Sequence, residues 1–447
     1  MTRANRCKSQ RVRLLTAILL PLLWPLALSA TDGHFLHGAG PVNEAMGGAD
    51  TGLCLDASGA IAWNPACTVR FQKSRFELYG IYFVPWRDLS STVDAGAFGP
   101  GMPATTLSGT TVSHRDASFM PGFAVVFHSP DSRTAFHFAM LAVSGFGVDY
   151  DQNTNFSNPI LTPQAPNGFG FGKIRSNYAL LTMPIGLSRE ITSRLSAGFS
   201  IVPAYSMLKV IPAPFAAPVT NGSTMPYYLS ASKTDSAVGI GAQAGVQYKF
   251  SDVWSAGLAW HSPVWFRSFH WNAADLTGTQ HKLNFQLDLP QLITMGIGIT
   301  PSKRTHIGID GRWFNYANTS GFDEAGYDPD DSVAGFGWRN IWAAGGGIEQ
   351  EVVSGTKLIV GYNYSQNPIP SQYAFFNTPA PAIVQHHVSA GIEQSLRHGW
   401  QLNLAYYHAF RNSLSGPWVS QQGAIPGTSL TSRMSENSVS VGVAKSF

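Results

Sequence analysis

Charged side chains are few in this chain of 447 residues, yet several fall on segments with the alternating pattern of β-strands. The set that this alternation turns toward the interior of a closed sheet consists of Asp310, Arg312, Lys357, His387 and Glu393. A charge inside a protein needs a partner, and this set contains both signs. We interpret it as a hydrogen-bonded network that joins an inner segment to a surrounding wall, in preference to a catalytic set.

The sequence lacks the common motifs of hydrolases and nucleotide-binding enzymes. It contains no Gly-x-Ser-x-Gly, no His-Glu-x-x-His and no Walker loop. We therefore assign no catalytic residue and expect neither an enzyme nor a cofactor. A hydrolase site built from Ser, His and Asp on different strands is the enzymatic alternative, because such a triad leaves no local spacing signal.

An acidic loop is the candidate for a metal site, and its carboxylates are Asp323, Glu324, Asp328, Asp330 and Asp331. Calcium sites of this kind need an ordered spacing of oxygen ligands. Pro329 interrupts the run, and its spacing is irregular. We interpret the segment as a solvated loop and expect no metal site.

Two cysteines, Cys54 and Cys67, remain once Cys7 is set aside with the N-terminal leader described below. In an oxidising compartment they could close a short loop and stabilise it by about 3 kcal/mol. Spacing alone does not fix a pairing, so a disulfide and two buried free thiols both stay open.

The first thirty residues have the order of a secretory signal, and we predict cleavage near Ala30. Five basic residues precede an apolar run from Leu14 to Leu28, which small residues follow. The run is short for a membrane anchor, and two prolines break it. Five of the 29 basic residues leave with the signal, so 24 basic residues face 26 acidic ones in the mature chain. That near-neutral balance gives no basis for a nucleic-acid partner.

The rest of the chain has the pattern of a membrane barrel. Charged residues make up 12% of it, about half of the ~25% that is usual in soluble domains. From Ala237 to Phe250, one alternating face is apolar or aromatic and the other is mostly Gly and Gln. Similar alternation recurs from Trp400 to Phe410 and near the terminal Phe447. Such faces suit lipid and a lumen, so we predict an all-β fold, a transmembrane antiparallel β-barrel over residues 74–447.

Short polar segments predict the number of strands. Six of them are typical of the tight turns at one end of a barrel, namely 129–133, 190–193, 251–254, 301–304, 350–355 and 397–399. With both ends of the barrel chain on the same side, they predict about fourteen strands. Barrels of about eight strands fill with their own side chains, whereas those of 16–18 leave a channel. A soluble β-sandwich is the competing fold, but it would need neither so few charges nor a terminal aromatic.

A barrel of intermediate width would leak unless something occupied it, and the glycine-rich stretch from Gly38 to Ala66 is suited to that position. Each glycine costs about 1 kcal/mol relative to alanine in a regular element, so the stretch needs support from its surroundings. We predict that residues 31–73 form a plug inside the barrel. The stretch ends in Asn64-Pro65-Ala66, where proline cannot donate to a ladder and asparagine can bond its own backbone. That triplet predicts an irregular turn.

These features together resemble the FadL-type outer-membrane transporters of long-chain fatty acids and aromatic hydrocarbons. The resemblance rests on the plug, the Asn64-Pro65-Ala66 triplet, the later Asn367-Pro368-Ile369-Pro370 and the terminal Phe447. It covers nearly the whole mature chain and is clearest in the plug and from Leu289-Pro290 to Phe314. It implies the same number of strands, and it implies that the triplet belongs to the contact between the plug and an opening in the wall.

The resemblance also implies a side window in the third strand. That strand is predicted from Thr134 to Val143 and runs into Ser144-Gly145-Phe146-Gly147. Glycine within a strand marks a bulge, a bend or a close backbone approach, although the residues alone also fit an ordinary strand end. In the family, an inward kink of this strand opens a window through which an apolar substrate passes into the bilayer.

Candidate substrate contacts lie in the predicted loop 211–235 and in the strand before it. The loop offers Ile211, Phe215, Tyr227 and Tyr228, which suit either capture of an apolar ligand or packing on a neighbouring loop. The strand end contributes Tyr205, Met207 and Lys209. A fatty acid needs a cationic partner, and Met207 stands where the family suggests an arginine. Lys209 is the substitute unless strand parity turns it away, so neutral hydrocarbons stay open as cargo.

We therefore expect passive transport of a hydrophobic small molecule across the outer membrane of a Gram-negative bacterium. Downhill partitioning into the bilayer would suffice as the driving force. The expected surroundings are outer-membrane lipid and lipopolysaccharide, and we expect a monomer. A nonselective porin and an outer-membrane lipase or protease are the alternatives.

Overall fold

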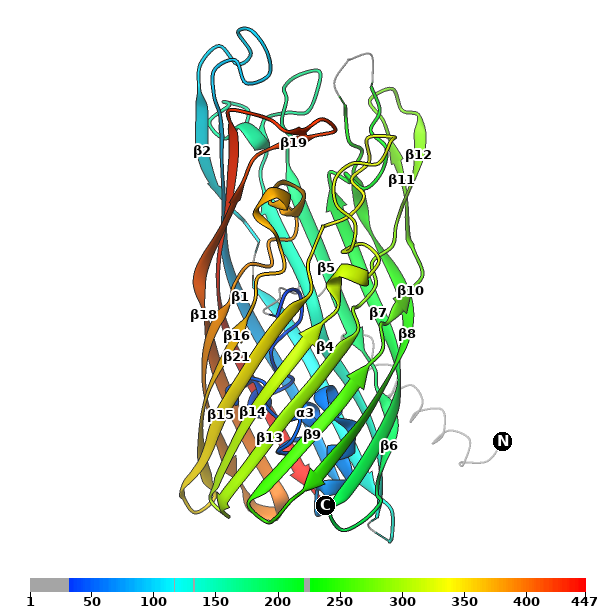
Figure 1. Cartoon of the computed structure of the whole chain (residues 1–447), viewed down its shortest axis with the longest axis vertical. Coiled ribbons are helices and arrows are strands. Elements are labelled where there is room, and N and C mark those ends of the chain that lie inside the picture. Colours follow the sequence, from blue (N-terminus) through cyan, green and yellow to red (C-terminus); the bar gives the residue numbers. More distant parts are fainter. Residues whose placement is uncertain (1–31, 116, 132, 221–225) are drawn as a thin grey trace, which may run out of the picture.

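The chain forms a closed antiparallel β-barrel in a computed structural model that describes residues 32–115, 117–131, 133–220 and 226–447 (Figure 1). The predicted signal sequence lies outside these residues. Seventeen strands share one sheet; β2 and β10 only extend neighbouring strands, and β5 and β6 occupy one position, which leaves fourteen barrel strands. The ring closes where β1 pairs with β21, from Arg75–Ser446 to Val93–Thr428. The predicted barrel of about fourteen strands is confirmed.

The barrel strands follow one another in chain order. They are β1 (Arg75–Val93), β3 (Ser118–His128), β4 (Thr134–Tyr150), β5 (Ile174–Thr182) with β6 (Ile185–Glu190), β7 (Leu195–Ile211), β8 (Ala231–Lys249), β9 (Trp254–His261), β13 (Leu292–Ser302), β14 (Thr305–Phe314), β15 (Ile341–Val353), β16 (Thr356–Ser365), β17 (His386–Ser395), β18 (Trp400–Gly416) and β21 (Thr428–Ser446). Short strands extend or cap the barrel: β2 (Leu107–Val112), β10 (Trp265–Phe266), β11 (Phe269–Ala274), β12 (Gln280–Phe285), β19 (Val419–Ser420) and β20 (Gly423–Ala424).

The two ends of the barrel differ in the length of their connections. All six predicted tight turns join consecutive barrel strands at one end, which also carries the C-terminus (Figure 1). There the amide of Phe447 donates to the carbonyl of Ser74 over 3.0 Å. The long connections gather at the other end. They contain the β11–β12 hairpin and the 3-10 helices η3 (Pro159–Leu161), η4 (Tyr316–Asn318), η5 (Ser371–Tyr373) and η6 (Phe375–Asn377), whereas η7 (Arg397–Gly399) forms a tight turn.

Alternation along the strands gives the barrel an apolar outer belt. Phe199, Ile240, Ile309 and Val360 come from four different strands, and each is more than half exposed. Side chains that point outward from a barrel face the lipid when the barrel lies in a membrane. No helix in the described part of the chain is long and apolar enough to cross a membrane.

Residues 32–70 lie inside the barrel, nearer its tight-turn end (Figure 1). They include the short helices α2 (Pro41–Ala45) and α3 (Ala57–Trp63) and the 3-10 helix η2 (Pro65–Arg70). Nearly all of these residues are buried. Asp56 caps α3 by accepting a hydrogen bond from the Gly59 amide over 3.3 Å. The segment that begins at Asp32 is therefore the plug, and β1 follows it at Arg75.

Glycines of the wall let the plug backbone approach closely. A Cβ atom on Gly345 of β15 would overlap the carbonyl oxygen of Gly47, and one on Gly361 of β16 would overlap that of Ala45. Gly47 itself has a φ of 64°, which disfavours other residues. Glycines on both partners thus set the distance between plug and wall.

We predict that Gly345→Val loosens the plug while leaving the barrel closed. The added isopropyl group has no space, and overpacking of this kind costs about 1–3 kcal/mol. The measurement is ion conductance in planar bilayers, which should rise as the plug leaves its seat.

Gly311→Val is the matched control on the neighbouring strand. Gly311 points outward, and the nearest atom to an added Cβ, the Cγ of Met295, is 3.6 Å away. Conductance of Gly345→Val equal to that of this control would contradict the predicted fit of plug and wall.

Candidate functional site

Arg312 of β14 holds four parts of the plug at once. Its guanidinium Nη1 lies 3.3 Å from a carboxylate oxygen of Asp32 and donates to the carbonyl of His37 over 2.8 Å. Nη2 donates to the carbonyl of Gly48. The guanidinium carbon lies 3.7 Å from the centroid of the Trp63 ring. Because Arg312 and Asp32 are almost completely buried, these contacts replace the hydrogen bonds that water would otherwise make with the two charges.

The N-terminal turn of the plug, residues 32–36, closes the middle of the lumen. His34 Nδ1 lies 2.8 Å from the hydroxyl of Tyr316, and its ring lies among those of Phe322 and Trp338, at centroid distances of 4.7 and 5.7 Å. Burial lowers the pKa of His34 to about 3, so the imidazole is neutral. Burial also raises the pKa of Asp32 to about 6 despite the nearby Arg312. Apart from Asp32, which pairs with Arg312, the turn carries no charge, and we call it the stopper turn.

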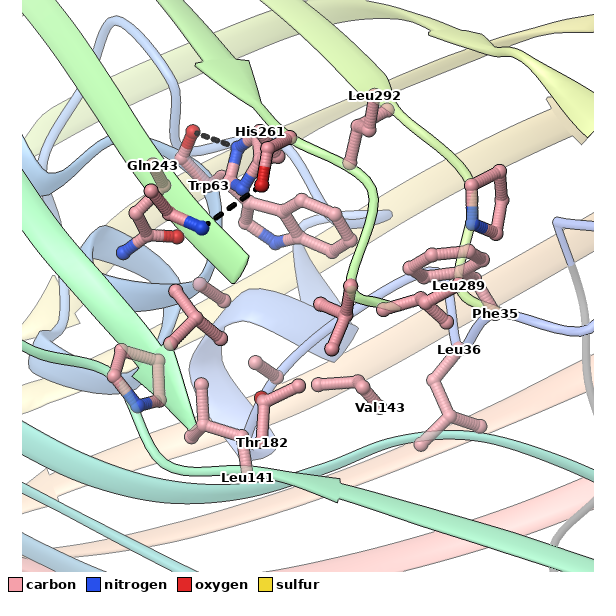
Figure 2. Close-up of a pocket in the computed structure, with 18 of the residues that line it drawn as sticks. Phe35, Leu36, Trp63, Leu141, Val143, Thr182, Gln243, His261, Leu289 and Leu292 are labelled. Atoms are coloured by element: carbon pink, nitrogen blue, oxygen red, sulfur yellow. Dashed lines mark hydrogen bonds between the residues drawn. The ribbon is translucent and has the colours of Figure 1, made fainter. Parts of the chain in front are cut away.

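An apolar cavity, which we call the chamber, lies beside this turn (Figure 2). Its empty volume is about 630 Å³. The plug lines it with Phe35, Leu36 and Trp63, and the wall lines it with residues that include Leu141, Val143, Pro184, Val202, Leu289, Pro290 and Leu292. The apolar lining suits a small hydrophobic molecule.

The few polar groups of the chamber already have partners. Gln243 Nε2 donates to the carbonyl of Ile61 over 2.8 Å. His261 Nε2 lies 3.2 Å from the carbonyl of Trp63, and Figure 2 labels Gln243, His261 and Trp63 beside the chamber. The lining contains no lysine or arginine among the described residues. A carboxylate placed here would lose its hydration without gaining a cation, so the chamber favours uncharged groups.

Further cavities lead from the long-loop end toward the chamber. An open cavity of about 1240 Å³, the vestibule, is lined by aromatic residues that include Phe169, Tyr228, Tyr327 and Trp418. Two smaller cavities lie deeper, and together their lining includes Phe146, Pro214, Phe215, Val333, Phe336 and Phe376. Phe171 and Phe375 line both the vestibule and the first of these cavities. The stopper turn lies next to both: Phe35 and Leu36 line the chamber, and the ring of Phe322 lies 4.7 Å from that of His34 and 5.6 Å from that of Phe336 in the deeper cavity.

Strand β4, the predicted third strand, parts from β3 halfway along. The ladder between them ends at the pair Phe123–Met140, although β3 continues beside β1 as far as Ser118. Against β5, β4 carries one extra residue, Val143, where the register shifts. Such a bulge bends its strand. The neighbouring strand position is itself interrupted between β5 and β6, next to Pro184.

Above the bulge, the freed backbone of β4 bonds with the stopper turn. The amide of Leu36 donates to the carbonyl of Val143 over 2.9 Å, and the amide of Gly145 donates to that of His34 over 3.1 Å. Ser144 forms an isolated bridge with Phe35. Of the predicted residues, Ser144, Gly145 and Phe146 are buried on the β4 segment that contacts or neighbours the plug, and Gly147 follows them.

The Asn64-Pro65-Ala66 triplet contacts a different part of the wall. Asn64 Nδ2 donates to the carbonyls of Thr51 and Val246, over 2.8 and 3.0 Å. Its Oδ1 accepts from the Ala66 amide over 3.1 Å, and Ser196 Oγ donates to the Ala66 carbonyl over 2.9 Å. The triplet is therefore the predicted irregular turn, but it rests on β7 and β8 and not on the kinked segment of β4.

Strand parity corrects the predicted substrate contacts on β7. The buried side chains of its upper half are those of Ser206, Leu208 and Val210. The alternate residues Tyr205, Met207, Lys209 and Ile211 point away from the lumen, so Lys209 cannot hold a carboxylate there. The predicted contacts in the loop after β7 do face the interior. Phe215 lines a deep cavity, Tyr228 lines the vestibule, and Tyr227 pairs with Val219 and packs on the core.

The predicted polar network divides into two kinds of contact. Asp310 and Arg312 bond directly with the plug: Asp310 Oδ2 accepts from the amides of Asp50 and Thr51, both over 2.9 Å. Lys357 instead joins two wall residues, with Nζ 2.8 Å from Glu393 and 3.1 Å from Glu349. His387 stacks on His37 of the plug at a centroid distance of 5.3 Å.

Cys54 and Cys67 are joined by a disulfide within the plug. The bond ties the segment before α3 to η2, which lies against the wall at the tight-turn end. In the acidic loop, Ser332 Oγ donates to Asp330 over 2.6 Å, and the loop bonds internally. No cluster of three potential metal ligands occurs among the described residues.

Several residues of the site were not predicted from the sequence. Trp63 directly precedes the triplet, and Leu289 and Pro290 lie in the stretch where the family resemblance was clearest, so position along the chain was a usable signal for them. His34 and Val202 gave no such signal. Their roles depend on which side of the lumen each strand occupies, which alternation alone does not determine.

Solved structures with this fold include three bacterial proteins. The Pseudomonas putida toluene transporter TodX matches with a TM-score of 0.66 and 18% identity, over 92% of this chain and 99% of that chain. A Pseudomonas aeruginosa FadL homologue gives 0.69 and 15%, over 93% and 100% of the two chains. The Ralstonia pickettii toluene transporter TbuX gives 0.62 and 16%, over 92% and 99%.

The sequence itself matches no family model and no curated protein. At these identities the structural likeness concerns the fold. The resemblance to FadL-type transporters is confirmed at that level.

We predict that Arg312→Leu releases the N-terminal part of the plug. Removal of one partner from a buried ion pair costs about 3–5 kcal/mol, because the other charge stays buried. Conductance in planar bilayers should rise, and Asp32→Asn/Arg312→Leu should recover part of the closure. Arg304→Leu is the control, since Arg304 lies in a tight turn and its side chain is 71% exposed. If Arg312→Leu conducted no more than the Arg304→Leu control, the proposed role of Arg312 in holding the plug would be contradicted.

Proposed function

We propose that the protein is an outer-membrane channel of the FadL type that passes uncharged hydrophobic molecules from the outside into the bilayer. The observation that carries this proposal is the chamber. It is apolar and without cations, the stopper turn closes it from above, and it borders the interrupted β3–β4 ladder through Leu141 and Val143. An enzyme needs reactive groups at its pocket, whereas a conduit needs an apolar path and a gate.

The proposed route begins in the vestibule. Aromatic rings there bind an apolar molecule weakly, and the deeper cavities offer it a drier surface. Displacement of the stopper turn, residues 32–36, then joins these cavities to the chamber. The disulfide and the triplet hold the rest of the plug, so the movement is confined to the turn.

Exit from the chamber is proposed to be sideways. Beyond the Phe123–Met140 pair, the upper part of β4 bonds with the plug instead of with β3. When the turn moves, the carbonyl of Val143 loses its partner Leu36, and the wall has an unpaired edge at this level. Partitioning into lipid then drives release without another energy source.

The cargo is proposed to be a neutral hydrocarbon in preference to a fatty acid. Lys209 points outward, and the chamber lining offers no cation to a carboxylate. Two of the similar structures are named toluene transporters, and toluene is a neutral hydrocarbon, which agrees with this preference. This preference can be tested by comparing the uptake of an alkylbenzene with the uptake of the corresponding carboxylate.

The two alternatives make different predictions. A nonselective porin would conduct ions with its plug in place, whereas the clamped plug predicts almost no conductance. A barrel hydrolase would cleave a phospholipid or peptide, and one Ser or His substitution would abolish that activity.

We predict that Val202→Phe lowers uptake of an apolar substrate severalfold. Val202 lines the chamber, so a larger ring there occupies the space that the cargo needs. The measurement is the uptake of a radiolabelled alkylbenzene by cells that make the protein. Ile201→Phe is the control, because Ile201 is the adjacent residue and points outward, 47% exposed. Equal uptake by the two variants would exclude the chamber from the route.

We also predict that deletion of Val143 abolishes uptake without preventing barrel assembly. The deletion removes the extra residue of the bulge, so β4 straightens and its ladder with β3 extends upward. Heat-modifiable migration on gels checks that the barrel has formed. An assembled deletion variant with normal uptake would refute the sideways exit.

A further inference from the structure

Four basic side chains gather on the outside of the barrel just above the β4 kink. They come from three places in the fold: Arg115 from the β2–β3 connection, Lys173 and Arg175 from the start of β5, and Lys209 from β7. Register brings them together, because Gly147 pairs with Asn177 and Asn177 pairs with Lys209 in one row across β4, β5 and β7. We call these four residues the cationic patch.

The patch has more positive than negative charge. Asp149 forms ion pairs with two of its members, with Lys173 Nζ at 2.8 Å and Arg175 Nε at 3.4 Å. Lys173 also lies 2.7 Å from Asp151. Among the residues that the structure describes, two carboxylates therefore pair with members of this group of four cations. Lys209 forms no ion pair within the described residues, although its neighbours are Arg175 and Lys173.

Contacts within the patch fix its geometry. Arg115 Nη2 donates to Asn177 Oδ1 over 2.9 Å, which draws its guanidinium across β4. A Cβ on Gly147 would lie 3.2 Å from Arg115 Nε, so glycine leaves room for this crossing. The side chains of Lys173 and Arg175 are each 37% exposed and can reach a ligand.

The patch lies at the upper border of the apolar belt. On β7, Phe199 and Ile201 are 51% and 47% exposed, and Met207 separates them from Lys209. On β4, Phe136 and Phe138 occupy the belt, and Asp149 lies above the bulge. A membrane lipid presents the same order, with acyl chains below and charged groups at the interface. Phosphate is the anion that clustered arginine and lysine bind best.

We propose that the cationic patch binds the phosphate groups of a phosphorylated lipid of the outer leaflet, whose acyl chains then cover the interrupted β3–β4 segment. This inference rests on the membrane orientation given under the proposed function, with the long loops outside. The bound lipid would form the first apolar surface that cargo meets on leaving the chamber. The site would thus hold a lipid beside the proposed exit, on the outside of the barrel, and would not contact the cargo inside the lumen.

The test is lipid binding by the purified full-length mature protein in detergent, followed by native mass spectrometry. The probes are a diphosphorylated lipid A, its dephosphorylated form with the same acyl chains, and inorganic phosphate. The diphosphorylated lipid should bind, and the dephosphorylated one should bind more weakly. Arg175→Gln/Lys209→Gln should weaken binding of the first roughly tenfold to hundredfold, as loss of charge-assisted hydrogen bonds does.

Arg411→Gln is the matched control. Arg411 of β18 is another outward cation, but it stacks on Trp86 at 4.5 Å and pairs with Asp88 at 3.0 Å, both on β1, which β3 separates from β4. Its variant should bind the lipid normally. Equal binding of both lipids, equal binding by the two variants, or displacement by equimolar inorganic phosphate would overturn the proposal.

Uptake assays separate this inference from the proposed function. If the native protein binds the lipid but transports no hydrocarbon, the site stands and the transport proposal falls. If Val202→Phe lowers uptake while the patch variants bind lipid like the native protein, the transport proposal stands and the lipid-site proposal falls.

Discussion

The structure depends on one constraint: an irregular segment inside a wide barrel must find hydrogen-bond partners where water is scarce. Arg312 meets the largest part of that need, because one guanidinium bonds with Asp32, His37 and Gly48. Other wall side chains act in the same way. Glu77 accepts from the amides of Ala57 and Ser58 at the start of α3, over 2.8 and 2.9 Å. The wall thus supplies the bonds that the plug cannot make within itself.

The lumen has two chemically different sides. Between β16 and β1, through β17, β18 and β21, its buried residues include Asn363, His387, Glu436, Ser438 and Ser440, and helix α2 packs there. Between β4 and β13, aliphatic and aromatic residues surround the chamber, while Ser196, Gln243 and Gln247 of β7 and β8 bond with the plug. A polar wall holds the plug by directional bonds, whereas an apolar wall leaves space beside it. The plug is therefore anchored on both sides of the lumen, and the chamber occupies only part of one of them.

The bulge at Val143 connects the plug to the continuity of the wall. Because one residue is extra, β4 bends away from β3, and its carbonyl and amide groups turn to Leu36 and His34. The unpaired edge that this bend creates is satisfied only while the stopper turn is in place. In the proposed route, these same hydrogen bonds couple the opening of the lumen to the opening of the wall.

The sequence alone determined the class of fold and most of its plan. Period-two alternation, few charges and six polar turns were sufficient for a barrel of about fourteen strands, because a barrel needs only a repeating local pattern. The glycines from Gly38 onward indicated a plug, because so many glycines cannot form a regular element without support from their surroundings. The tertiary structure decided the site. Which face of β7 looks inward, and so where Lys209 points, depends on parity fixed by closure of the whole ring. The chamber joins Trp63 to Val202 and Leu292, residues far apart in the chain, and no local pattern records that they meet.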